Sequence, residues 1–154
     1  MAKKAVKAKA KKKTTTKAKA KPKAKAPTQS NSKAAMAKQL ALVLSDTYVL
    51  AVKTHGYHWN VTGPNFGPLH TLFEEQYNAL TAAADEVAER IRALGFYPDG
   101  SMDSFLQNTV IKEAGVKKMS ANAMLKDLVK SYDAMRERIA DAEDLADEID
   151  DLVT

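Results

Sequence analysis

Three stretches of this chain carry apolar residues at the spacing of an α-helix, and this periodicity constrains the fold more than any other feature. The stretches span residues 34–62, 68–94 and 120–151. In each, large apolar side chains recur three and four positions apart, which is the pattern of a helix that buries one face. No alternation of β-branched residues indicates a strand. The sequence therefore predicts an all-α fold, a bundle with three long helices.

Capping residues and helix breakers set the expected ends of these helices. Ser32 is a plausible N-cap of the first helix, and Gly63-Pro64 ends it. Pro68 suits the first turn of the second helix, where its missing N–H needs no partner, and Gly95 closes that helix. Ser120 is the expected N-cap of the third helix.

The connection between the second and third long helices spans residues 96–119. Pro98-Asp99-Gly100 is a turn signal, and Ser101 can cap a short helix that runs through Gln107. We therefore expect one short helix in an otherwise irregular segment.

Residues 1–33 differ from the rest of the chain in charge and complexity. They hold 13 lysines and no acidic residue, a net charge of +13, whereas residues 34–154 hold 11 basic and 19 acidic residues, a net charge of −8. After Met1, no apolar residue in this segment is larger than Val6, so it cannot bury a core, and its like charges repel. We predict a disordered tail over residues 1–33 and one helical domain over residues 34–154.

The tail has the composition of an arm that binds nucleic acid. Lysines neutralise phosphates without reading bases, and the tail has no arginine or aromatic residue for specific recognition. The alternatives are a solubilising tail or a transit peptide, although transit peptides favour arginine and amphipathic helices. The lysines expected to contact DNA are Lys3, Lys4, Lys7, Lys9, Lys11, Lys12, Lys13, Lys17, Lys19, Lys21, Lys23 and Lys25.

The absence of cysteine removes several kinds of site from consideration. Disulfides, iron–sulfur clusters and thiolate zinc sites all need cysteine, and a cysteine-free chain suits a reducing cytosol. No uninterrupted apolar run approaches the roughly 20 residues of a membrane span, and the N-terminus lacks the apolar core of a secretory signal. We therefore expect a cytoplasmic protein that does not cross a membrane.

Four polar residues of the second helix form a symmetric pattern. His70 and Glu74 are four positions apart, as are Asp85 and Glu89, so each pair lies on one helix face. About 16 Å separates the pairs along the helix, too far for one metal centre in one chain. Positions 70 and 89 nevertheless share their midpoint, 79.5, with positions 74 and 85. Two antiparallel copies of this helix would therefore form two identical sites, each with His70 and Glu74 of one chain and Asp85 and Glu89 of the other.

Three carboxylates and an imidazole, with no sulfur ligand, suit iron or manganese better than structural zinc. His58, at the end of the first helix, can complete this site. His55 lies one turn earlier and is either a spare ligand or a packing residue, of which we favour packing. Taken singly, the other residues have ordinary alternatives. Glu89 can pair with Arg92 on the surface, Asp85 and Glu89 can form a solvated face, and His70 can simply be a histidine near a helix start.

The segments HWNVTGPNF, LHTLFE and DEVAERIRALG, all within residues 54–95, resemble the Dps family of ferritin-like DNA-binding proteins. Weaker similarity continues through residues 131–148, so the resemblance covers residues 34–154. It implies a ferroxidase centre at a two-fold subunit interface, with Trp59 beside it to absorb oxidising equivalents. The implied ligands are His58, His70 and Glu74 from one chain and Asp85 and Glu89 from its partner.

The resemblance also implies an activity and an assembly. Fe(II) would be oxidised to Fe(III), preferably by hydrogen peroxide, and stored inside a hollow dodecameric shell that protects DNA in the bacterial nucleoid. Acidic residues near the end of the third helix would line a pore through which iron enters. Asp147, Asp150 and Asp151 are the candidates, and a solvated acidic helix end is the alternative.

Members of that family have a fourth long helix after the acidic stretch, whereas this chain ends at Thr154, where that helix would begin. All five implied ligands lie upstream of this point, so the site can form without that helix. For the shell, we expect either that the sequence is a fragment of a longer chain or that the assembly is altered. A competing hypothesis is an architectural protein that compacts DNA, in which the helical body only oligomerises the lysine arms.

Overall fold

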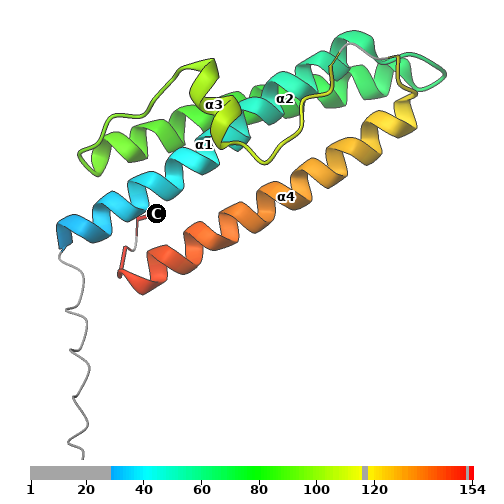
Figure 1. Ribbon diagram of the computed structural model, residues 1–154. Helices are drawn as coiled ribbons and strands as arrows, with labels where there is room; N and C mark the ends of the chain where they lie inside the picture. Colours follow the sequence, from blue (N-terminus) through cyan, green and yellow to red (C-terminus); the bar gives the residue numbers. More distant parts are fainter. Residues whose placement is uncertain (1–28, 116–117, 152) are drawn as a thin grey trace, which may run out of the picture.

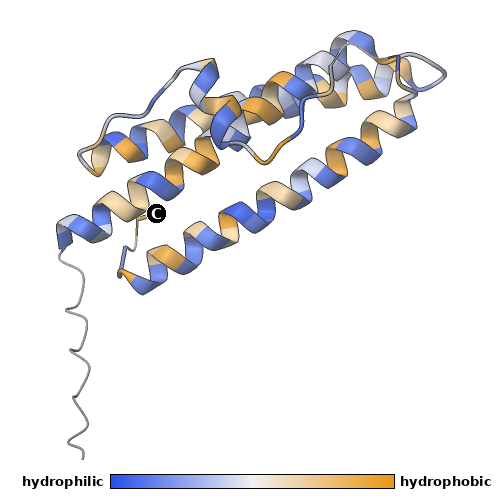
Figure 2. Cartoon of the chain, in the orientation of Figure 1, coloured by the Kyte–Doolittle hydropathy of each residue, from blue (hydrophilic) through white to orange (hydrophobic). Residues whose placement is uncertain are grey.

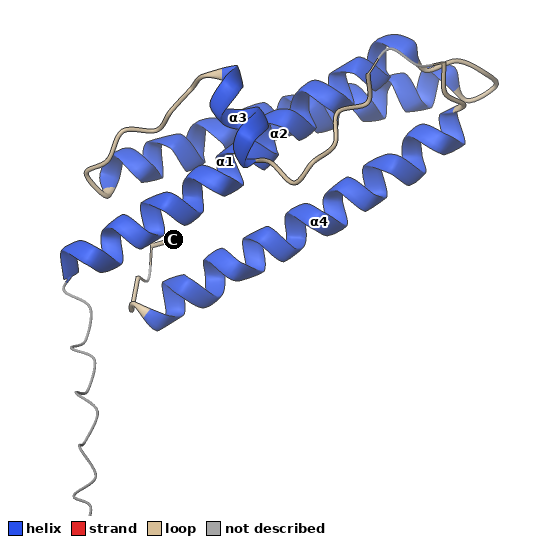
Figure 3. Cartoon of the chain, in the orientation of Figure 1, coloured by secondary structure: helices blue, strands red, loops and turns tan. Residues whose placement is uncertain are grey.

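The computed structural model describes residues 29–115, 118–151 and 153–154 (Figure 1). The helices are α1 (Gln29–Asn60), α2 (Phe66–Ala93), α3 (Met102–Asn108) and α4 (Ala121–Glu148). Three long helices and one short helix, with no strand among the described residues, confirm the predicted all-α fold (Figure 3). The lysines proposed to contact DNA fall in residues 1–28 and lie outside the described residues. The disorder predicted for residues 1–33 is wrong for residues 29–33, because α1 begins at Gln29, and for residues 1–28 it stays a prediction.

Helix α1 is the central element of the fold. It packs against α2, α4 and the short α3, whereas α2 and α4 make little contact with each other. The first and last long helices meet where the side-chain amide of Gln39 donates to the carbonyl of Arg138, at 3.4 Å. The start of α1 and the end of α4 therefore lie at the same end of the molecule (Figure 1).

The core is formed where α1 faces its neighbours, and Figure 2 shows apolar residues concentrated along α1. Leu50 from α1, Phe73 from α2 and Met124 from α4 are essentially inaccessible to solvent. Burying a side chain of this size contributes about 1.5–3 kcal/mol. Tyr48 of α1 stacks on Phe105 of α3 with ring centroids 4.7 Å apart, which fixes the short helix against α1.

Most of the predicted helix ends are confirmed. The hydroxyls of Ser101 and Ser120 accept hydrogen bonds from the backbone N–H groups three residues later, each at 3.3 Å, and cap α3 and α4. Gly95 closes α2 with φ +96°, a conformation that favours glycine. The predicted N-cap at Ser32 is wrong, because α1 begins at Gln29 and Ser32 lies inside it. Residues 29–35 are mostly exposed, so no burial pattern in the sequence marks where this helix starts.

Asp46 of α1 connects three parts of the fold. Its carboxylate is completely buried and accepts hydrogen bonds from the Thr109 hydroxyl and the Val110 N–H, each at 2.7 Å, and from Arg138 Nε at 3.1 Å. A buried carboxylate needs several such partners to offset its lost hydration. Asp46 therefore holds the segment after α3 against both α1 and α4.

By length and composition, α1 could cross a membrane, which differs from the expectation that no segment of the chain would. Its most apolar window is 61% buried inside the fold. The same helix carries the buried polar residues Asp46, Lys53 and Thr54. The core helix of a bundle meets the same length and composition criteria, and these buried contacts assign α1 to that role.

Candidate metal centre

His58 and His70 lock the end of α1 to the start of α2. Nδ1 of His58 lies 2.9 Å from the backbone oxygen of His70, and Nδ1 of His70 lies 2.9 Å from the backbone oxygen of His58. Their rings stack with centroids 3.7 Å apart. The two predicted histidine ligands are thus brought together by a reciprocal pair of hydrogen bonds.

These contacts determine which ring nitrogens remain available. A carbonyl oxygen only accepts hydrogen bonds, so Nδ1 of each ring must carry the proton. The lone pair of each neutral imidazole then lies on Nε2, the atom that can bind a cation. Protein metal sites commonly orient histidine ligands by such a hydrogen bond from the other ring nitrogen.

Aromatic rings surround the histidine pair. His55 stacks on Tyr77 with ring centroids 4.0 Å apart, and Trp59 lies against His55 at 4.2 Å. Tyr77 also meets the ring of His58 edge-on, at 5.4 Å. The contacts of His55 are those of a packing residue, in line with the interpretation favoured from the sequence. Tyr77 was not expected at this site, because its spacing from His70 alone does not reveal that its ring reaches His55 and His58.

The three carboxylates predicted as ligands are exposed on α2. Glu74, Asp85 and Glu89 all face solvent and make no salt bridge within the described part of the chain. In residues 29–115, 118–151 and 153–154, no group of three or more histidine or acidic side chains is placed to hold a metal ion. In one copy of the chain, the described residues therefore do not bring the five predicted ligands together into a single site.

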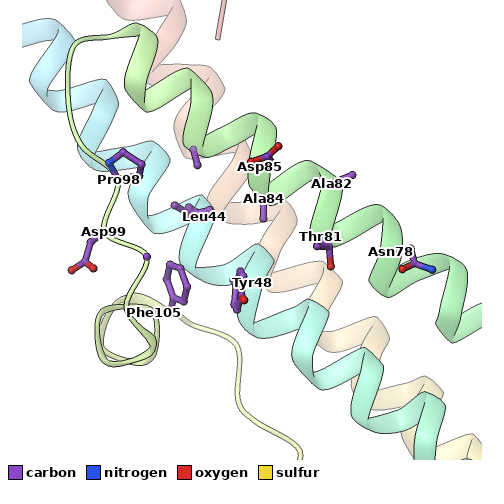
Figure 4. Close-up of a pocket in the computed structure, with 12 residues that line it drawn as sticks. Leu44, Tyr48, Asn78, Thr81, Ala82, Ala84, Asp85, Pro98, Asp99 and Phe105 are labelled. Carbon is purple, nitrogen blue, oxygen red and sulfur yellow. The ribbon is translucent and has the colours of Figure 1, made fainter.

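A pocket of about 630 Å³ lies beside Asp85. The pocket is lined by Tyr48 from α1, by one face of α2, by Phe105 from α3 and by the loop that contains Pro98 and Asp99 (Figure 4). The α2 wall is built from small side chains, including Ala82. The exposed face of α2 therefore carries a recess next to a predicted ligand.

The three aspartates considered for a pore have different surroundings. Asp147 and Asp150 are exposed at the end of α4. Both carboxylate oxygens of Asp151 instead bind Arg90 of α2, at 2.6 and 2.8 Å. Burial alone would raise the pKa of Asp151, but hydrogen bonds from Thr154 and Arg90 outweigh it and lower the pKa. Asp151 therefore connects the segment that follows α4 to helix α2.

A polar network that the sequence did not predict joins α1 and α4. The ammonium of Lys53 pairs with the Asp127 carboxylate and donates to the Ser131 hydroxyl at 2.9 Å. The Tyr57 hydroxyl donates to the same carboxylate at 2.7 Å. Burial and the bond to Asp127 raise the pKa of Tyr57. The only sequence signal was that Lys53 and Tyr57, like Asp127 and Ser131, are spaced one helical turn apart.

Comparison with known proteins identifies the family. The ferritin-like domain family matches residues 37–154. DNA protection during starvation protein 2 of Bacillus anthracis is 37% identical over 123 residues, which cover 77% of this chain and 84% of that protein. The chain belongs to the Dps family of ferritin-like proteins.

Two further matches were found, one to a protein sequence and one to a solved structure. A low temperature-induced protein of Nostoc sp. is 46% identical over 98 residues, covering 64% of this chain but only 55% of its own length. The crystal structure of a Dps protein from Vibrio cholerae, described as a ferritin-like diiron-carboxylate protein, superimposes with a TM-score of 0.76 at 32% identity. That match covers 79% of this chain and 76% of the Vibrio chain. The described fold is therefore that of known Dps proteins.

Proposed function

We propose that the chain forms two-fold dimers that oxidise Fe(II) and, through its lysine-rich tail, bind DNA and protect it. Each dimer has two sites. His58, His70 and Glu74 of one copy face Asp85 and Glu89 of the other. The main support is the reciprocal hydrogen bonding of His58 and His70, which occupies Nδ1 of both rings and leaves Nε2 of each as the atom that can bind a cation.

The exposed carboxylates support the shared site. Glu74, Asp85 and Glu89 are solvated in one copy and have no partner in a salt bridge among the described residues. Ionised carboxylates on one helix face repel each other, so a cation held between two copies would stabilise both faces. Oxygen-rich ligands with imidazole suit iron in either oxidation state.

Iron is the substrate of the proposed reaction. Two Fe(II) ions each give up one electron, and hydrogen peroxide takes both electrons with two protons to form two molecules of water. A paired two-electron reduction releases no hydroxyl radical. The carboxylates favour the product, because anionic oxygen ligands stabilise Fe(III) more than Fe(II). The relatives named for DNA protection, together with 13 lysines in residues 1–33, support DNA as the molecule protected.

The replacement Asp85→Asn tests the site. It removes one ligand charge in each shared site while keeping the size of the side chain, so peroxide-dependent Fe(II) oxidation should slow at least tenfold. DNA affinity should not change, because the tail is intact. Stopped-flow absorbance of the ferric product and gel-shift titration measure the two activities.

Asp133→Asn is the matched control for this experiment, since Asp133 is an exposed aspartate on α4, outside the site. It should oxidise iron at the wild-type rate. If Asp85→Asn also did so, the assignment of the site would be wrong. If neither the wild type nor any variant oxidised iron while DNA binding persisted, the chain would instead be an architectural DNA-compacting protein.

A further inference from the structure

Trp59 is a large apolar side chain that the single chain leaves uncovered. Its exposed fraction is 67%, and it is the only tryptophan in the sequence. The indole lies against the ring of His55, and most of the remaining indole surface is exposed in the described part of the chain. An exposed tryptophan beside a polar site is typical of a side chain that anchors a protein interface.

The ring contacts fix the level of Trp59 along α2. The ring of His58 lies on His70, and the ring of His55 lies on Tyr77, with centroids 3.7 and 4.0 Å apart. Trp59 follows His58 in sequence and touches His55. Its indole therefore lies beside the stretch of α2 between positions 70 and 77.

The proposed two-fold axis determines which residues of the second copy lie at the same level as Trp59. This step rests on the proposed function, in which two α2 helices pack antiparallel about the midpoint 79.5 of the ligand pattern. Positions 70 and 77 then face positions 89 and 82 of the other chain. In that arrangement Trp59 of one copy lies at the level of residues 82–89 of the other.

Residues 82–89 carry the pocket beside Asp85. Ala82, Asp85 and Ala88 form part of its α2 wall, and Leu44 and Phe105 supply apolar surface across from them (Figure 4). The volume of about 630 Å³ is ample for an indole ring. The carboxylate of Asp85 offers an acceptor for the indole N–H, which needs one when it is buried.

We propose that Trp59 of each copy inserts into this pocket of the other copy and anchors the two-fold dimer. The two insertions are related by the axis and flank the shared metal sites. The pocket between α1, α2 and α3 is thereby assigned as the receptor for the indole, and Trp59 as the anchor of the interface. The same insertion shields both metal sites from solvent.

Intrinsic fluorescence tests the insertion directly, since a single tryptophan gives an unambiguous signal. Full-length protein is examined over a range of concentrations, with its mass measured in parallel by sedimentation velocity. As dimers form, the emission of Trp59 should move to shorter wavelength, and its quenching by acrylamide should fall at least threefold. Equal quenching in the associated and dissociated states would overturn the insertion while leaving the two-fold site in place.

Two replacements test the anchor and its receptor separately. Trp59→Ala removes the anchor, and Ala88→Leu fills the pocket from its α2 wall with a good helix former. Each should raise the dimer dissociation constant at least tenfold, and Ala88→Leu should also leave Trp59 accessible to acrylamide. Val129→Ala is the control, because Val129 is an exposed apolar residue on α4, away from this face. Circular dichroism verifies that each variant folds.

The outcomes separate the inference from the proposed function. If Trp59→Ala and Ala88→Leu associate like the wild type, the anchor role is refuted, even if iron oxidation remains intact. If the wild type stays monomeric at every concentration, both the insertion and the shared metal site are refuted.

Discussion

Among single residues, Lys53 and Asp127 form an ion pair whose partners differ in burial. The side chain of Lys53 is only 2% exposed, whereas that of Asp127 is 36% exposed. Removing the carboxylate leaves a buried ammonium without a counter-charge. Removing the ammonium leaves a carboxylate that water and the Tyr57 hydroxyl still reach. Removing the carboxylate should therefore lower the free energy of unfolding more than removing the ammonium does.

We expect Asp127→Asn to lower the free energy of unfolding by about 3 kcal/mol, as for a buried charge that loses its partner. Lys53→Met should cost about 1 kcal/mol, because the remaining carboxylate is partly hydrated. Urea denaturation followed by circular dichroism measures both. Asp133→Asn, on the same helix but exposed, should change stability by less than about 0.5 kcal/mol. Equal losses for Asp127→Asn and Lys53→Met would contradict this account.

The same pair makes stability depend on pH in the acid range. Burial alone would raise the pKa of Asp127, but hydrogen bonds from Lys53 and Tyr57 and the charge of Lys53 outweigh it, so the pKa lies below 3.8. The contribution of Asp127 is therefore complete above pH 3.8 and disappears as the pH falls through the lower pKa of the folded state. The stability difference between wild type and Asp127→Asn should shrink when urea unfolding is repeated below this pH. A constant difference would exclude the linkage.

The sequence predicted some residue contacts and could not predict others. The spacing of His70, Glu74, Asp85 and Glu89 follows directly from helical periodicity, so their common face was predictable. The bonds between His58 and His70 use backbone oxygens, which carry no sequence signal. The contact between Asp46 and Arg138 joins residues 92 positions apart, and only the packing of α1 against α4 brings them together.

At the scale of secondary structure, helix ends were predictable where a side chain caps them or a glycine stops them. Ser101, Ser120 and Gly95 each do so locally. The start of α1 was not predictable, because the residues around Gln29 are exposed and no cap distinguishes one start from the next. Local chemistry therefore sets three of these boundaries, while the fourth has no local determinant.

The packing of α4 depends on its charged contact with α1. Arg138→Met should destabilise the fold by about 3–5 kcal/mol, because the fully buried Asp46 loses its counter-charge. Thermal unfolding measures the loss, and hydrogen exchange should show faster exchange at Val110, whose N–H binds the same carboxylate. Arg136→Met is the control, since Arg136 is exposed on the same helix and should cost little. An equal loss in both variants would exclude a special role for Asp46.

For the whole molecule, charge is divided between a basic tail and an acidic body. Residues 1–33 carry +13 and residues 34–154 carry −8. The tail enters the fold at the start of α1, at the end of the molecule where α4 finishes with Asp147 and Glu148 (Figure 1). Because the body is acidic, we expect DNA to be bound by the tail alone.

Deleting residues 2–27 should therefore remove DNA binding and its dependence on salt. Each phosphate contact steepens the log–log dependence of affinity on salt by about −0.9, so a tail making several contacts gives a slope of several units. Fluorescence anisotropy with a short duplex at several salt concentrations measures the slope in both proteins. Iron oxidation by the truncated protein serves as the control for folding. An unchanged slope after truncation would place the DNA contacts on the helical body.

The reciprocal bonds between His58 and His70 have a consequence for how inactive forms should be recognised and made. If the same two rings both fasten the helical hairpin and bind a cation, as proposed, the loss of either ring also weakens the hairpin. The exposed carboxylates proposed as ligands form no salt bridge in the described part of the chain. Relatives that have lost the proposed iron oxidation would therefore be expected to lose the carboxylates first and to keep both histidines. The presence of both histidines is thus weak evidence of iron oxidation. An inactive variant that still folds should be made by replacing Asp85 and Glu89.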